Sequence, residues 1–192
     1  MKRICVYCSS SDQIAELYFE ATRRLARILV KMEARVVFGG GKKGLMGCLA
    51  DEVLAHQGTI TGIMPEFMRE VEMHHQDVED FLFTPDMHSR KQKLLEDTDA
   101  LIALPGGCGT LEELMEAITL KRLGRYLQPI IIVNTGGYYD PLVEMLNRSI
   151  EEKFMHPKHG DMWTVIREPE ELPAALSNAT SWGSDALNFA TM

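Results

Sequence analysis

Hydrophobic residues along the chain follow two alternating spacings. Largely apolar runs of strand length occur at residues 3–8, 35–41, 59–65, 99–105, 129–134 and 163–166, and the more polar segment 77–83 is expected to form another strand. Between these runs, apolar residues recur at the three- and four-residue intervals of one helix face, at residues 14–32, 45–56, 87–96, 111–123, 140–154 and 168–176. Strands that alternate with helices of this length are typical of βαβ units. The pattern therefore predicts an α/β protein.

The strand pattern also predicts how the sheet is covered. The run PIIIVN at residues 129–134 is rich in β-branched residues and has no polar alternation, as expected for a strand buried on both faces. We therefore expect a Rossmann-like, doubly wound, mostly parallel sheet with helices on both faces, forming a single domain over residues 1–180. The last segment, 181–192, belongs to a stretch rich in Ser, Thr and Asn and is expected to be a loose tail.

Composition narrows the class of ligand. The 192 residues are 45% hydrophobic, enough for one full core, and the net charge is −8. An acidic chain without a basic stripe argues against binding to nucleic acid or to a membrane surface, so a small molecule is the expected ligand. The start, MKRICVYCSS, has too few apolar residues for a signal-peptide core, and no apolar stretch is long enough to span a bilayer. We expect a cytoplasmic protein.

Cysteine and histidine residues do not suggest a metal site or a redox pair. Cys5 and Cys8 are three residues apart on a predicted strand, so their side chains are expected on opposite faces of the sheet. His74 and His75 are adjacent and lack a second ligand pair at metal-site spacing, which favours a surface loop. We therefore expect no metal and no cofactor.

Unusual polar and glycine-rich segments follow three of the predicted strands. They are CSSSD at 8–12, GGGKKGLMG at 39–47 and PGGCGT at 105–110. In a doubly wound sheet, ligands bind beyond the carboxyl ends of the strands, where glycine turns let backbone N–H groups approach an anion. Because the helix behind such a turn adds partial positive charge, these segments favour a phosphate-binding site. For GGGKKGLMG, tight turns alone are an equally good explanation.

The stretch PGGCGTLEE, residues 105–113, has two interpretations. Thr110 and Glu113 have the T-x-x-E spacing of a capping box, which would serve helix stability alone. That interpretation leaves the preceding glycines and the second carboxylate, Glu112, unexplained. The basic residues of SRKQK, at 89–93, could neutralise a bound anion or simply form a solvated helix face. The chemistry favours a phosphate-ligand site.

These motifs resemble those of a known family. PGGCGTLEE fits the PGGxGTxxE signature of the LOG ("lonely guy") family, and GGGKKGLMG resembles its second glycine motif. CVYCSSS, PDMHSRK and GGYYDPL are similar to family segments in the family order, so the resemblance runs from Ile4 to about Leu176. Members are cytokinin riboside 5′-monophosphate phosphoribohydrolases, some of which carry the older label of possible lysine decarboxylases. No lysine in the sequence stands out as the pyridoxal phosphate ligand that a decarboxylase would require.

The resemblance implies roles for individual residues. The family's catalytic arginine and glutamate fall on Arg90 and Glu113. Substrate or phosphate binding falls on a larger set, composed of Gly40, Gly41, Met87, Lys91, Gly106, Gly107, Gly109 and Thr110. A carboxylate can stabilise the oxocarbenium-like state of ribosyl–base cleavage or activate water, and an arginine can orient phosphate or sugar oxygens.

The expected activity is hydrolysis of the N-glycosidic bond of adenosine 5′-monophosphates, with or without an N6 substituent, to free base and ribose 5-phosphate. The resemblance also implies a homodimer or larger homo-oligomer. Apolar surface for it is expected in MREVEMHHQ, residues 68–76, and around Leu120. One departure is LKRLG at 120–124, where many members have WAQLG, so the preferred base stays open. Two alternatives are open. One is a molybdenum-cofactor carrier-like protein, against which the presence of both Arg90 and Glu113 argues; the other is a non-catalytic nucleotide-binding protein, which only an assay separates from the enzyme.

Overall fold

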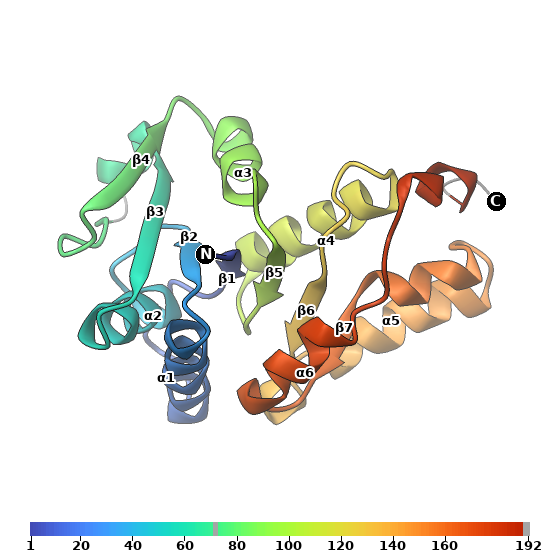
Figure 1. Ribbon diagram of the computed structural model, residues 1–192, viewed down its shortest axis with the longest axis horizontal. Helices are drawn as coiled ribbons and strands as arrows, with labels where there is room; N and C mark the ends of the chain where they lie inside the picture. Colours follow the sequence, from blue (N-terminus) through green and yellow to red (C-terminus); the bar gives the residue numbers. More distant parts are fainter. Residues whose placement is uncertain (71–72, 190–192) are drawn as a thin grey trace.

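The computed structural model describes residues 1–70 and 73–189. Two residues of the MREVEMHHQ segment, Val71 and Glu72, lie outside the described residues. A seven-stranded sheet forms the centre, in the order β4-β3-β2-β1-β5-β6-β7, and every pairing is parallel (Figure 1). The strands are β1 (Arg3–Tyr7), β2 (Arg35–Phe38), β3 (Thr59–Pro65), β4 (Asp80–Thr84), β5 (Ala100–Ala103), β6 (Ile130–Val133) and β7 (Thr164–Ile166).

Helices cover both faces of this sheet, which confirms the predicted Rossmann-like α/β class. They are α1 (Glu16–Lys31), α2 (Gly44–Ala55), α3 (Met87–Leu95), α4 (Cys108–Arg122), α5 (Asp140–Glu151) and α6 (Leu172–Ser177). Buried side chains of α1, α2 and α6 share one core cluster with the sheet, and those of α3, α4 and α5 share the other. The helix predicted over 168–176 divides into a 3-10 turn, Pro169–Glu171, and α6. Among the described residues, no helix is long and apolar enough to cross a membrane.

The central strand alternates between the two cores. Ile4 and Val6 point into the cluster with α1 and α2, whereas Cys5 and Tyr7 point into the cluster with α4 and α5. Cys8 joins the first cluster, so Cys5 and Cys8 lie on opposite faces, as the three-residue spacing predicted. Both cysteines are buried.

The strand order explains why the polar segments meet. From β1 the chain winds outward through β2, β3 and β4, and then crosses to β5 on the other side of β1. The switch in winding direction therefore lies between β1 and β5. The three polar and glycine-rich segments follow β2, β1 and β5, which are neighbours, so their carboxyl ends form one continuous edge.

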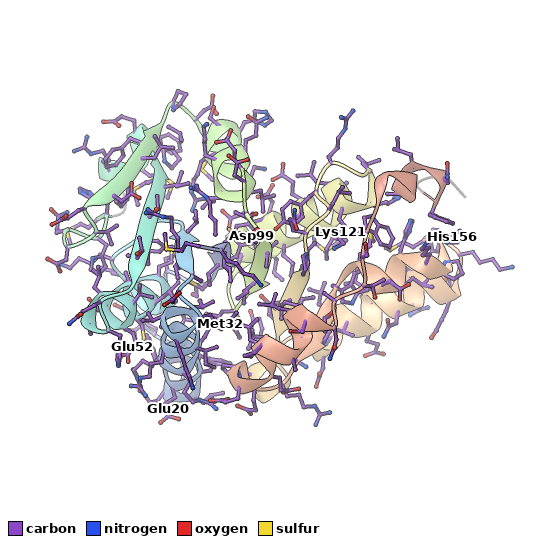
Figure 2. The ribbon with its side chains drawn as sticks, viewed as in Figure 1. Glu20, Met32, Glu52, Asp99, Lys121 and His156 are labelled. Carbon is purple, nitrogen blue, oxygen red and sulfur yellow. The ribbon has the colours of Figure 1, made fainter. Side chains whose placement is uncertain are left out.

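The C-terminal segment packs on α4 and differs from the expected loose tail as far as Phe189. Trp182 is buried, and its indole Nε1 donates a hydrogen bond to the carbonyl of Lys121 at 2.7 Å. Ala186, within the 3-10 helix Ser184–Phe189, is also buried. Lys121 belongs to α4 (Figure 2). A composition rich in small polar residues did not reveal that one aromatic side chain anchors the segment; residues 190–192 lie outside the described range.

Candidate active site

A cavity of about 370 Å³ opens at the carboxyl ends of β1, β2 and β5. This volume lies within the range of small-molecule sites, and the position is the one where doubly wound sheets bind ligands. Its lining consists of Val6, Tyr7, Cys8, Ser9, Ser10, Ser11, Gly39, Met46, Met68, Met87, Arg90, Gly107, Cys108, Gly109, Thr110 and Glu113. Two of the three polar segments, 8–12 and 105–110, therefore contribute half of the wall residues, and the segment 39–47 contributes Gly39 and Met46.

Arg90 and Glu113 form a buried ion pair in this cavity. The Arg90 guanidinium Nη1 donates to Glu113 Oε1 at 2.7 Å, and each residue is only 8% exposed. Arg90 also donates from Nε to the carbonyl of Ile63 at 3.3 Å. Asp86 caps α3 by accepting from the Ser89 backbone N–H at 2.7 Å, which sets where that helix begins and hence where Arg90 projects. The two residues assigned to catalysis by resemblance thus meet, although 23 positions separate them.

The capping-box interpretation of Thr110 and Glu113 is wrong. The helix begins at Cys108 with Gly107 as its N-cap, so Thr110 lies inside the first turn. No side chain in the described part of the chain caps the helix, and the Glu113 carboxylate accepts from Arg90 instead of from the N-cap backbone. A Cβ on Gly106 would lie 2.1 Å from Thr110 Oγ1, so the glycine lets the threonine pack over the turn. The earlier start brings the helix N-terminus to the cavity.

The start of α4 is suited to an anion. Gly107, Cys108, Gly109 and Thr110 all line the cavity. A Cβ added at Gly107 or Gly109 would meet nothing within 4 Å, so these two glycines do not serve packing within the chain. Their absent side chains leave the first backbone N–H groups of a 15-residue helix open to the cavity, where the helix dipole adds positive charge. A phosphate group fits this arrangement.

Burial sets the protonation behaviour of Glu113. Loss of solvent raises the pKa of the carboxyl group above its usual range, and the Arg90 guanidinium partly offsets the increase. The carboxylate is therefore stabilised by one specific partner rather than by water. Such a group combines a perturbed pKa with a position in a cleft, as catalytic acids and bases commonly do.

The glycine turn after β2 both shapes the ligand site and forms tight backbone turns. Gly39 lines the cavity, and a Cβ there would lie 2.4 Å from Arg90 Nη2, so this glycine makes room for the arginine. Gly44 has a φ of +61°, and a Cβ there would lie 2.5 Å from the Ser10 backbone. A Cβ on Gly47 would lie 1.9 Å from the Lys42 carbonyl oxygen. Gly39 therefore shapes the site, whereas Gly44 and Gly47 permit tight backbone packing.

The other residues assigned by resemblance divide into two groups. Met87, Gly107, Gly109 and Thr110 line the cavity together with the ion pair. Four others, Gly40, Gly41, Lys91 and Gly106, are not in its wall.

Each of these four has another local role or partner. Lys91 donates to Glu112 at 2.6 Å and pairs with Glu116 at 2.9 Å, so its charge is already matched on the α3–α4 surface. Gly40, with φ +82°, packs against the Phe81 ring. The backbone of Gly41 forms an isolated antiparallel β-bridge with the backbone of His74. The Gly106 carbonyl accepts from the Tyr138 hydroxyl at 2.6 Å.

Sequence reasoning missed several residues of the cavity wall. The serines Ser9–Ser11 belong to a segment recognised as unusual, but no role was assigned to them. Met46 and Met68 contribute apolar wall, and their methionine side chains carry no signal that distinguishes a cavity from a core. Cys108 was hidden at the variable position of the PGGxGT signature.

The fold and the site together define a Rossmann-like protein with a preorganised pocket for an anionic small molecule. The family model described as "possible lysine decarboxylase" matches residues 46–176. The chain is 36% identical over 171 residues to a probable cytokinin riboside 5′-monophosphate phosphoribohydrolase, LOGL2, from Oryza sativa subsp. japonica, covering 89% of this chain and 70% of the relative. It is 35% identical over 175 residues to the phosphoribohydrolase LOG5 of Arabidopsis thaliana, covering 91% and 77%.

The chain therefore belongs to the LOG family. The family signature runs into α4 and ends at Glu113, whose ion-pair partner Arg90 belongs to α3. Among solved structures, the molybdenum cofactor carrier protein of Chlamydomonas reinhardtii matches with a TM-score of 0.69 and 18% identity, over 93% of this chain and 97% of that one. That likeness concerns the fold alone.

Proposed function

We propose that this protein hydrolyses the N-glycosidic bond of adenosine 5′-monophosphates, including N6-substituted ones, to the free base and ribose 5-phosphate. The observation that carries the proposal is the buried Arg90–Glu113 pair beside the open N-terminus of α4 in one cavity. The curated relatives named above are described as phosphoribohydrolases of cytokinin riboside 5′-monophosphates, which supports the same reaction class.

The geometry suggests a division of labour. The 5′-phosphate binds the backbone N–H groups at the start of α4, with the Ser9–Ser11 segment on the other side of the cavity. Glu113 then lies where it can stabilise the cationic ribosyl centre or accept a proton from the attacking water. Water supplies the oxygen that bonds to C1′, the C1′–N9 bond breaks, and the base leaves with a proton. Arg90 keeps Glu113 ionised and can orient ribose or phosphate oxygens.

The described cavity wall does not suit lysine decarboxylation, the reaction named in the description of the matching family model. A pyridoxal phosphate decarboxylase holds its cofactor on a lysine, and the lining residues among those described include no lysine. Lys91, the lysine next to Arg90 in the PDMHSRK segment, forms ion pairs with Glu112 and Glu116 outside the cavity wall. This chemistry is therefore not part of the proposal.

The base is the less constrained part of the substrate. Met46, Met68 and Met87 give the cavity an adaptable apolar wall. Leu120, in the segment that departs from many family members, lines a groove between α3 and α4 instead of this cavity. We therefore propose that plain AMP is accepted alongside N6-isopentenyl-AMP.

Incubation with AMP, N6-isopentenyl-AMP and the two matching nucleosides tests the proposal. Free base and ribose 5-phosphate, separated by chromatography, are expected from the monophosphates, with the nucleosides cleaved at least about 100-fold more slowly in kcat/KM because they lack the phosphate anchor. Equal kcat/KM for adenosine and AMP would contradict the phosphate assignment. Binding of AMP without release of base would instead identify a non-catalytic binding protein.

A further inference from the structure

The loop that carries His74 and His75 is bound to the glycine turn after β2. The His75 backbone N–H donates to the Gly40 carbonyl at 2.9 Å, and the Lys42 N–H donates to the Met73 carbonyl at 3.0 Å. The His75 side chain is 2% exposed, so the expectation that both histidines lie on a surface loop is wrong for His75. Backbone pairing with the turn buries the ring.

His75 is part of a three-residue cluster with Asp51 of α2 and Asp77. One potential ligand atom from each residue lies within 4.8 Å of the others. The His75 Nε2 atom lies 3.1 Å from Asp51 Oδ1, and the Asp51 side chain is 72% exposed. The cluster thus combines two exposed carboxylates, those of Asp51 and Asp77, with the buried imidazole of His75. The sequence did not show this because Asp51 and His75 are 24 residues apart and come from different elements.

The hydrogen bonding of the His75 ring is incomplete in both neutral tautomers. The buried Nδ1 atom has no hydrogen-bond partner among residues 1–70 and 73–189. If Nε2 carries the proton, it donates to Asp51 and leaves a buried Nδ1 lone pair unmatched. If Nδ1 carries the proton, a buried N–H is unmatched, and the Nε2 lone pair faces a carboxylate oxygen at 3.1 Å. A cation between Nε2 and the carboxylate would turn the repulsion in this second tautomer into two attractive bonds, and the proton would stay on Nδ1.

We propose that Asp51, His75 and Asp77 form a binding site for a divalent transition-metal cation such as Zn²⁺. Imidazole nitrogen with two carboxylates is a donor set that suits Zn²⁺. Metal–ligand bonds of about 2.0–2.2 Å at tetrahedral angles place ligand atoms about 3.3–3.6 Å apart, close to the 3.1 Å between His75 and Asp51. Water completes the coordination, since the carboxylates are exposed.

This site is separate from the proposed active site but is linked to it. None of the three residues lines the catalytic cavity. Through the His75–Gly40 hydrogen bond, a cation would tie α2 and the 73–77 loop to the turn whose first residue, Gly39, leaves space for Arg90. The expected consequence of binding is a more stable fold by mass action, independent of catalysis. The inference therefore does not depend on the proposed function.

Titration of the tag-free, metal-stripped protein with Zn²⁺ in a calorimeter tests the site, with Co²⁺ as a spectroscopic probe. We expect one ion per chain, a rise in Tm on binding, and visible absorption bands from bound Co²⁺. Co²⁺ should bind more tightly than Mn²⁺. Asp51→Asn and Asp77→Asn should each weaken Zn²⁺ binding by about tenfold or more. Because both carboxylates are exposed, these variants should fold normally.

Glu79→Gln is the matched control, because it removes the same charge two residues from Asp77 and outside the cluster. It should keep wild-type Zn²⁺ affinity. Absence of saturable Zn²⁺ binding would overturn the proposal. Equal weakening in all three variants would also overturn it, by showing only a general attraction of cations to this acidic surface.

Discussion

At the scale of single residues, Arg90 and Glu113 stabilise each other in a place where neither charge is well solvated. Both are 8% exposed and 2.7 Å apart. This differs from a solvated helix face, where loss of an arginine changes stability little. Removing one partner of a buried pair leaves an uncompensated charge, which typically costs about 3 to 5 kcal/mol.

We therefore predict that Arg90→Ala lowers the free energy of unfolding by about 3 kcal/mol and abolishes turnover. The double variant Arg90→Ala/Glu113→Gln should regain more than half of the lost stability but stay inactive, because the buried charge is gone and so is the base. Urea unfolding and base-release assays measure the two effects. A stable Arg90→Ala protein would show that water or a rearranged side chain replaces the arginine.

Glu113→Gln alone separates charge from hydrogen bonding. Glutamine keeps an oxygen that can accept from Arg90, but it cannot take a proton from water. We predict that the variant folds and loses about 100-fold or more in kcat. Glu112→Gln is the control, since Glu112 pairs with Lys91 outside the cavity wall and should keep most activity. Full activity of Glu113→Gln would remove Glu113 from the mechanism.

The pH dependence of activity follows from the raised pKa of Glu113. If the ionised carboxylate is required, activity falls as pH decreases through the raised pKa, at a higher pH than for an ordinary glutamate with a pKa of 4.5. We predict an acid limb of kcat/KM for AMP above pH 4.5, since kcat/KM reports groups of the free enzyme. An acid limb at or below that value would mean that Arg90 outweighs burial.

At the scale of elements, α4 joins the active site to the core of the domain. Its first turn lines the cavity, and near its end Lys121 is buried, with Nζ donating to the Gln128 carbonyl at 2.6 Å. Burial lowers the pKa of Lys121 to about 8 from the usual 10.5. Between these values the unfolded chain binds a proton that the folded chain does not. The lysine therefore contributes a stability that increases with pH across this window.

Comparison with Lys121→Met isolates this contribution from the other groups that titrate in the same range. The stability of the wild type relative to the variant should increase by about 2 kcal/mol between pH 8 and pH 10. Urea unfolding at the two pH values measures it. A constant difference between the two proteins would show that Lys121 keeps an ordinary pKa.

At the scale of the whole molecule, apolar surface around the end of α4 supports the homodimer or larger homo-oligomer that the family resemblance implies. Leu123 and Leu127 are 41% and 39% exposed, and they adjoin a groove between α3 and α4 lined in part by Leu95 and Leu120. A stable dimer buries at least about 1,200 Å² in total, and a broad apolar face meets that need more readily than scattered side chains.

We predict twice the chain mass in sedimentation at micromolar concentration. Leu123→Asp/Leu127→Asp should shift the protein toward monomer, whereas Met145→Asp, on the exposed face of α5, should not. A wild-type monomer would contradict the prediction. The cytoplasmic location expected from composition stays a prediction as well.

The sequence by itself determined the order and type of the elements, the parallel α/β class and the three segments that surround the site. These features depend on local periodicity and on glycine, which act within a few residues of the chain. The family signature located Arg90, Glu113 and most of the α4 turn. Element ends were less certain: α4 begins three residues earlier than predicted, because Gly107 can cap it without a side chain.

Only the tertiary structure decided which partner each functional group meets. Glu113 pairs with Arg90 across α3 and α4, Lys91 is matched by Glu112 and Glu116, and Gly39 replaces Gly40 and Gly41 in the cavity wall. In the same way, Asp51 contacts the His75 ring, and Trp182 donates a hydrogen bond to the Lys121 carbonyl near the end of α4. Each of these contacts joins residues that are distant along the chain. Periodicity carries no information about such pairs, since they depend on how the sheet and its helices pack in space.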